Sequence, residues 1–228
     1  MAYQAPAATG WLTPHRWQIA IFMAMRYEQY TMQISGGKYG IYHWRGTMFE
    51  LEGFIEDCKA IQAGGDDQAA IHELVSRAIS DPAALMKELG EPTQAGIQTL
   101  YQADNLTILN LTWGPYMTLK PHNHSMWAVI GIYTGREDNI FWRRDKDNPS
   151  QIEAAGAKNI GTGDCAQLGR DIIHSVTNPV PRITGALHVY GGDFFNEPRS
   201  QWDPDALLEE PFNVEDSRAL FALSNKML

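Results

Sequence analysis

The sequence predicts a mainly β protein in which a jelly-roll or small antiparallel barrel follows an N-terminal helical segment. In the first 91 residues, apolar residues recur at helical spacing. From Ile97 onward the chain changes to short runs rich in β-branched and aromatic residues, separated by Gly, Pro, Asn and Asp at roughly ten-residue intervals. We therefore expect residues 1–91 to form a helical segment that packs on a barrel domain of residues 92–228, which ends in a covering tail.

The first predicted helix begins at Thr13 and Pro14, an N-cap residue followed by the residue type favoured at the first helical position. It continues through RWQIAIFMAMRYEQY, where apolar residues recur at helical spacing. A glycine pair at 36–37 ends this helix, and YGIYHWR follows as a candidate strand.

Three more helices are predicted before the barrel. A capping-box pattern, Thr47 with Glu50, opens the first of them over MFELEGFIEDCKAI. The second, DDQAAIHELVSRAI, follows a glycine pair at 64–65, and the third runs from Asp81 to Gly90.

The barrel strands are expected in the runs LTILNLTW, MWAVIGIY, NIFWRR, CAQL, IIHSVT and ITGALHVY. In a small barrel, alternate residues of each strand point inward, so residues far apart in sequence can meet around a ligand. The tail after Arg199 is acidic and then weakly helical, and we expect it to cover the barrel.

The composition argues against nucleic acid and membrane partners. The formal net charge is -9 and no basic block is present, whereas nucleic-acid binding relies on clustered cations. No run reaches the ~18 apolar residues of a spanning helix. The N-terminus lacks the pattern of a secretion signal, and Cys58 and Cys165 show no disulfide spacing, so we expect a cytoplasmic protein. The sequence leaves a homo-oligomer open.

The histidine spacing indicates a metal site. His122 and His124 are one residue apart in PHNHSMWAVIGIYTG, so in an extended chain both imidazoles point to the same side. His174, in the run IIHSV, is the expected third ligand, because a metal site needs at least three protein ligands. Three imidazoles leave coordination positions open, as in catalytic sites, and they suit Zn(II) that activates water or Fe(II) that binds a chelating substrate with O2.

The two histidine segments resemble the paired motifs of the cupin superfamily. In cupins, His-x-His is followed by an acidic ligand and a glycine, and a second motif ends in His-x3-Asn. Five residues match these motifs: His122, His124, Gly135, His174 and Asn178. Ala128 and Val129 stand where the acidic ligand would be, which leaves three histidines without a carboxylate.

Within cupins, three histidines followed by His-x-Tyr resemble the thiol dioxygenases, the group of cysteine dioxygenase and 3-mercaptopropionate dioxygenase. In that group a Ser-His-Tyr relay lies in a later strand; His188 and Tyr190 match its last two members, and Ala186 replaces the serine. The resemblance implies Fe(II) as cofactor, with Zn, Ni or Mn as alternatives. It also implies that the protein oxidises a small thiol carboxylate with O2 to a sulfinate.

A substrate-binding cation is implied as well. In the mercaptopropionate branch, an arginine some nine residues beyond the tyrosine holds a carboxylate, and Arg199 has this spacing. A guanidinium suits that role because its planar fork matches a carboxylate. Arg170 and Arg182 are alternatives, and Gln102 is a candidate for an auxiliary hydrogen bond to the substrate.

Two other classes of protein fit the same residues. One is a three-histidine cupin oxygenase that cleaves a carbon–carbon bond in a diketone-like chelator. The other is a cupin that binds a small molecule, with or without a metal, and does not turn it over. In each case we expect Trp113 and Trp127 to wall the pocket.

Overall fold

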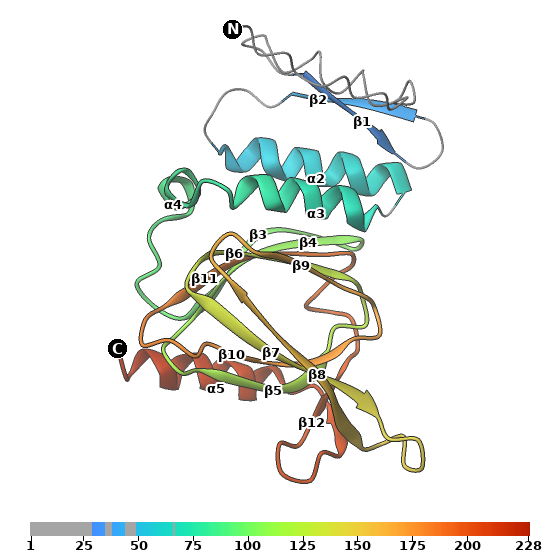
Figure 1. Ribbon diagram of the computed structural model, residues 1–228, viewed down its shortest axis with the longest axis vertical. Coiled ribbons are helices and arrows are strands. Elements are labelled where there is room, and N and C mark those ends of the chain that lie inside the picture. The colour runs from blue at the N-terminus through green and yellow to red at the C-terminus, as the bar shows by residue number, and fades with distance from the viewer. Residues whose placement is uncertain (1–28, 35–37, 44–48, 66) are drawn as a thin grey trace, which may run out of the picture.

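The structure, a computed structural model, describes residues 29–34, 38–43, 49–65 and 67–228. It confirms a mainly β fold in which helices precede a jelly roll of two antiparallel sheets (Figure 1). The division of the chain at residues 91 and 92 stays a prediction.

The barrel strands pair in a nested order. Within the described residues β4 pairs with β11, β5 with β10, β6 with β9 and β7 with β8, and every pairing is antiparallel. From β4 to β7, and again from β8 to β11, successive strands therefore alternate between two sheets, which is the connectivity of a jelly roll. The first sheet contains, in spatial order, β3 (Gly96–Ala103), β4 (Leu106–Trp113), β11 (Thr184–Tyr190), β6 (Ala128–Thr134) and β9 (Cys165–Leu168). The second contains β13 (Glu209–Pro211), β12 (Ser200–Trp202), β5 (Thr118–Asn123), β10 (Ile173–Thr177), β7 (Arg136–Arg144) and β8 (Ile152–Gly161).

Each of the six predicted strand runs forms a strand, with ends that differ by a few residues. The sequence did not reveal β8, because most of its residues are exposed and it shows no apolar run. The six runs also lack β3, the short strands β12 and β13, and β5, of which only the His122 segment was expected to be extended.

Three helices form a layer on the first sheet (Figure 1): α2 (Leu51–Gly65), α3 (Gln68–Ala78) and α4 (Pro82–Leu89). The starts of α3 and α4 follow from their caps, because Asp67 and Asp81 each accept a hydrogen bond from the backbone N–H three residues later. Gly90 lies at the end of α4 with φ of 86°, as predicted. Thr47 of the predicted capping box lies outside the described residues.

The N-terminal prediction is wrong in part. Most of the expected helix after Thr13 lies outside the described residues, but Gln29–Ile34 forms strand β1, which pairs with β2 (Lys38–His43). Tyr30, Thr31 and Ile34 favour a strand, and the Gly-Gly pair between the two runs favours a hairpin over a helix end. The candidate strand YGIYHWR is confirmed over most of its length by β2.

The three central strands of the first sheet, β4, β11 and β6, are buried on both faces, which explains why their residues are mostly apolar, whereas the edge strand β3 is largely exposed. On the outer face, Ile108 and Val129 pack with the helices, including Phe54 and Leu74. Gly131 is required there, because a Cβ atom would lie 2.6 Å from Cγ1 of Val75 on α3. The opposite face belongs to a second core inside the barrel, which contains Leu109, Leu111, Ala128, Ile130, Val176 and Ala186.

The C-terminal tail lies against the barrel. Helix α5 (Val214–Asn225) runs beside β5 and β10 (Figure 1) and begins at Asn213, whose side chain accepts from two backbone N–H groups. Phe221 of α5 is buried and stacks on Trp113 of β4, with ring centroids 5.6 Å apart. Within the described residues, none of the helices is both long enough and apolar enough to span a bilayer.

Two residues of the histidine motifs hold turns. Gly135, between β6 and β7, has φ of 84°, and a Cβ atom there would lie 2.8 Å from Cα of Thr184. Asn178 is fully buried after β10. Its amide donates to the carbonyls of Trp113, Gly114 and Arg182, and its oxygen accepts from Val180 N–H and the Thr184 hydroxyl.

Replacing Asn178 by alanine should lower the free energy of unfolding by about 2–4 kcal/mol, because several buried groups lose their partner at once. The measurement is a urea unfolding curve of the metal-free protein. Asn148→Ala is the matched control, because Asn148 is exposed and should change stability by no more than about 0.5 kcal/mol. Equal midpoints for the two variants would contradict this role of Asn178.

Candidate metal centre

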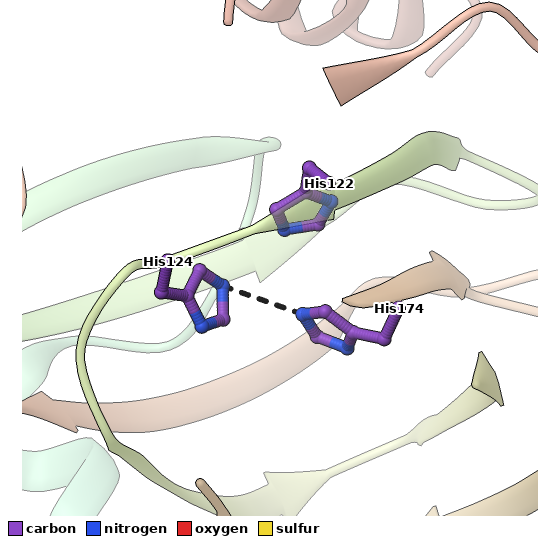
Figure 2. A group of neighbouring side chains, drawn as sticks. All are labelled: His122, His124 and His174. Atoms are coloured by element: carbon purple, nitrogen blue, oxygen red, sulfur yellow. Dashed lines mark hydrogen bonds between the residues drawn. The ribbon is translucent and has the colours of Figure 1, made fainter. Parts of the chain in front are cut away.

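Three histidines converge inside the barrel (Figure 2). His122 lies near the end of β5, His124 directly follows that strand, and His174 lies on β10. One ligand nitrogen from each lies within 4.8 Å of the others. The Nε2 atoms of His124 and His174 are 3.3 Å apart, as the dashed line in Figure 2 shows. All three side chains are at most 5% exposed.

The strand pairing produces this convergence. His122 and His174 are direct partners in the β5–β10 ladder, where opposing residues on one face lie within contact distance. His124 points to the same side as His122, because it is two residues further along an extended segment. Ser125 then has φ of 58°, which turns the chain away towards β6.

Hydrogen bonds orient two of the rings. Nδ1 of His122 lies 3.0 Å from the Lys120 carbonyl oxygen, and Nδ1 of His174 lies 2.8 Å from Oδ1 of Asn139. Because these oxygens only accept, each Nδ1 carries the hydrogen and each Nε2 keeps a free lone pair for a ligand bond.

Burial keeps the cluster uncharged. It lowers the pKa of His122 to about 4 and lowers the pKa of His124 and of His174 well below the usual range. Neutral imidazole is the form that binds metals. Three neutral nitrogen donors at this spacing fit a divalent cation, so the cluster could hold a metal.

Tyr190 and His188 lie beside the cluster on β11. The Tyr190 ring packs edge-on against His124 with centroids 5.1 Å apart, and its hydroxyl lies 2.9 Å from Nδ1 of His188. Nε2 of His188 is 3.7 Å from Oε1 of Glu137, which accepts a 2.6 Å hydrogen bond from Trp113 Nε1. Burial raises the pKa of Tyr190 well above its usual value, so the phenol is protonated at neutral pH.

Arg199 lies between two aromatic rings. Its guanidinium carbon is 3.9 Å from the ring centre of Phe194 and 4.1 Å from that of Phe212. Its Nη1 is buried and has no hydrogen-bond partner among the described residues. Burial lowers the pKa of Arg199 to about 10, so the side chain is still a cation at neutral pH.

These groups line one cavity of about 380 Å³. Its polar end contains the three histidines with His188, Tyr190 and Arg199. Its other walls are largely apolar and come from β3, β4, β5, β10 and α5. The arrangement allows the chain to hold a metal, an anion and an apolar group side by side.

Four residues expected near the site do not line this cavity. Gln102 is exposed and donates to Asp193, and Arg170 is exposed and donates to the Ser125 carbonyl. Arg182 is exposed in the turn after β10. The expectation that Trp127 walls the pocket is wrong, because its side chain belongs to the core under the helices. Trp113 does line the cavity.

Sequence reasoning missed the residues that support the histidines. Glu137 and Asn139 are two residues apart on β7, so both side chains point to the same face, and both are buried. The Glu137 carboxylate lies near His188, and the Asn139 amide oxygen accepts from His174. The available signal was the run REDN, in which two polar residues two apart precede an apolar stretch. Phe194 and Phe212 also escaped notice, since their ring contacts depend on the fold.

No protein-family model and no curated protein matches the chain in sequence. Similar solved structures include a RmlC-like cupin family protein of Methanocaldococcus jannaschii, with 10% identity, 46% of this chain and 85% of that chain covered, and a TM-score of 0.38. A cupin superfamily protein of Desulfitobacterium hafniense has 13% identity, 46% and 83% coverage and a TM-score of 0.36. A deletion mutant of Bacillus subtilis oxalate decarboxylase has 15% identity, 49% and 29% coverage and a TM-score of 0.37. This similarity concerns the fold alone.

Alanine at His122, His124 or His174 should weaken metal binding by about 100-fold or more. Removing a residue that only hydrogen-bonds a ligand already lowers metal affinity by about 10- to 100-fold, and loss of the ligand itself should cost at least as much. Titration of the metal-free protein with Fe(II), or with Zn(II) as a redox-inert probe, measures this loss. His72→Ala, which removes a half-buried histidine of α3 outside the cluster, should bind as the unmodified chain does. Equal binding by all four variants would contradict the site.

Proposed function

We propose that this chain is a non-haem Fe(II)-dependent thiol dioxygenase that oxidises a thiol carboxylate with O2 to a sulfinate. One observation carries the proposal: a cluster of three neutral histidines shares a cavity with Arg199, which is half-buried, and among the described residues the cluster has no carboxylate and Arg199 has no anionic partner. The resemblance of these residues to the thiol dioxygenases supports the same reading. The overall reaction balances as RS⁻ + O2 → RSO2⁻.

The donor set fits the metal and the substrate charge. Imidazole suits Fe(II) as well as Zn(II) and Ni(II), and Mn(II) is a further candidate. Because His122, His124 and His174 are neutral, a divalent metal keeps its full positive charge, which favours an anionic thiolate as a ligand. Held by these three histidines, Fe(II) would supply the redox chemistry by which O2 oxidises the thiolate.

Arg199 would hold the carboxylate of the substrate. It lies near the cluster, because Phe194 contacts Arg199 and also lies 6.1 Å from His124 between ring centres, while Phe212 lies 6.2 Å from His122. The two rings restrict the guanidinium to the plane between them, so less entropy is lost when it binds an anion. A carboxylate there would also give the buried Nη1 a partner.

Tyr190 would orient what binds at the metal. Its ring lies against His124, and its hydroxyl is protonated at neutral pH and bonded to His188. The protonated phenol therefore adds no negative charge beside a thiolate held at the metal. Phe194, stacked at 4.4 Å from Tyr190, helps to exclude water from this end of the cavity.

The test is O2 uptake by anaerobically purified, Fe(II)-loaded protein with 3-mercaptopropionate, cysteine and cysteamine. We expect uptake with the two carboxylates and little with cysteamine, which lacks one. Arg199→Ala should raise KM for the active thiol by about 30-fold, which corresponds to ~2 kcal/mol of a buried charged hydrogen bond.

Arg170→Ala, which removes an exposed arginine outside the cavity, is the matched control and should keep the unmodified KM. A protein that holds one iron tightly and consumes no O2 with any of the three thiols would overturn the proposal. A diketone-cleaving oxygenase or a binding protein would then take its place.

A further inference from the structure

The cavity is larger than a small thiol acid requires. Its volume of about 380 Å³ lies within the ~300–1,000 Å³ range of pockets that enclose drug-sized ligands. The groups that would hold a thiolate and a carboxylate, the histidines and Arg199, gather around Phe194 and Phe212. The rest of the volume therefore surrounds some other part of a ligand.

The remaining walls are mostly apolar and converge from both sheets and the tail, with Thr99, Ser217 and Arg218 as their polar members. Six side chains make up this apolar section: Ile97, Leu111, Leu119, Val176, Val214 and Phe221. Leu111 and Val176 are almost fully buried, whereas Ile97 and Val214 are 42% and 44% exposed. The section thus runs from the barrel interior to an opening beside β3 and the start of α5.

We propose that the acid bound in this cavity carries an apolar group, aromatic or branched, that fills the apolar section. This proposal rests on the proposed function for the carboxylate at Arg199, and it revises the expected substrate from a thiol acid of 3-mercaptopropionate size to a larger one. Burying an apolar group against these walls contributes favourable free energy of binding, and a short acid has no apolar group to bury there.

A pair of sulfur-free acids tests this independently of thiol oxidation. Calorimetry with the full chain, loaded with Fe(II) under anaerobic conditions, would compare 3-phenylpropionate with propionate. We expect Kd at least tenfold lower for 3-phenylpropionate. Equal affinities would overturn the proposal, whether or not the protein oxidises thiols, and a failed O2 uptake assay would leave this comparison intact.

A filled cavity provides the second measurement. Ser217 lies on α5, is half-buried and lines the cavity, so Ser217→Trp should abolish the preference for 3-phenylpropionate. Ala219→Trp places the same side chain on the exposed part of α5 outside the cavity and should keep the preference. A preference that survives Ser217→Trp in a folded protein would overturn the location of the site.

A separate observation concerns the carboxylate behind His188. Glu137 has no exposed surface, and its only ion-pair contact among the described residues is with His188. Its Oε1 accepts from Trp113, and its Oε2 has no hydrogen-bond partner there. A buried carboxylate costs stability unless it accepts hydrogen bonds. The ring nitrogen of His188 that faces Glu137 is therefore favoured as a donor.

The acceptor-only carboxylate restricts the tautomer of His188. With Oε1 of Glu137 3.7 Å away, the hydrogen of His188 is favoured on Nε2, where no other partner is present in the described residues. Nδ1 is then an acceptor and takes the hydroxyl hydrogen of Tyr190 across 2.9 Å. The lone pairs of the phenol oxygen remain for a group in the cavity.

The geometry points to Glu137 as a positioning residue for Tyr190. It acts through His188, and its effect is to present the Tyr190 oxygen to the cavity as an acceptor. This inference rests on the proposed function only for the identity of the ligand that contacts the phenol oxygen. The directions of the hydrogen bonds among Glu137, His188 and Tyr190 are argued from the structure.

Nitrogen-15 NMR of histidine-labelled, metal-free protein reads the tautomer directly. We expect the hydrogen of His188 on Nε2 in the unmodified chain, and its transfer to Nδ1 or a mixture in Glu137→Leu. Glu137→Gln, whose amide oxygen still accepts, should restore the Nε2 form. Glu153→Leu, which removes an exposed glutamate of β8, is the control and should change nothing.

Finding the His188 hydrogen on Nδ1 in the unmodified chain would overturn the assignment, even where Glu137→Leu fails to fold. For a folded Glu137→Leu with normal metal content, we expect O2 uptake with kcat at least tenfold lower and KM nearly unchanged. An unchanged kcat in a variant whose tautomer has shifted would overturn the positioning role.

Discussion

The pairing of β5 with β10 is the constraint on which the site depends. It sets His122 opposite His174 in the interior of the jelly roll, and the extended chain after β5 adds His124 on the same side. The interior position removes water from all three imidazoles and so keeps them neutral. A shift of one residue in this register would turn His122 to the other face and dissolve the cluster.

The rest of the barrel stabilises these buried polar groups. Strand β7 is the neighbour of β10, and its alternate residues Glu137 and Asn139 reach inward to His188 and His174. Asn178 closes the turn after β10, and Gly135 allows the turn between β6 and β7. The helices α2 to α4 cover the first sheet, so its central strands β4, β11 and β6 are buried on both faces.

Much of this could be predicted from the sequence, because the signals are local. The short apolar runs predicted the strands, Asp81 with Gly90 predicted the ends of α4, and the spacing of His122 and His124 predicted a shared direction. Arg170 and Arg182 were alternative candidates because they flank the second histidine motif and the His188 strand, but neither they nor the auxiliary candidate Gln102 line the cavity. Their exposure depends on strand pairing that no local pattern encodes.

The missed features are those that arise only between distant strands. Glu137 meets His188 across 51 residues of chain, and the two rings around Arg199 come from segments on either side of β12 and β13. Strand β8 was not predicted because it lies at the edge of a sheet with exposed faces, where a strand needs no apolar alternation. The residues that support the site and the strand β8 thus depend on tertiary packing, which local sequence patterns do not reveal.

The central claim is that three histidines and no carboxylate bind the metal in this cavity. X-ray absorption at the iron edge of the Fe(II)-loaded protein tests it most directly, before and after addition of 3-mercaptopropionate. We expect scattering from three imidazoles, joined by one sulfur neighbour when the thiol is added. Scattering from fewer than three imidazoles, or an iron environment that the thiol leaves unchanged, would contradict it.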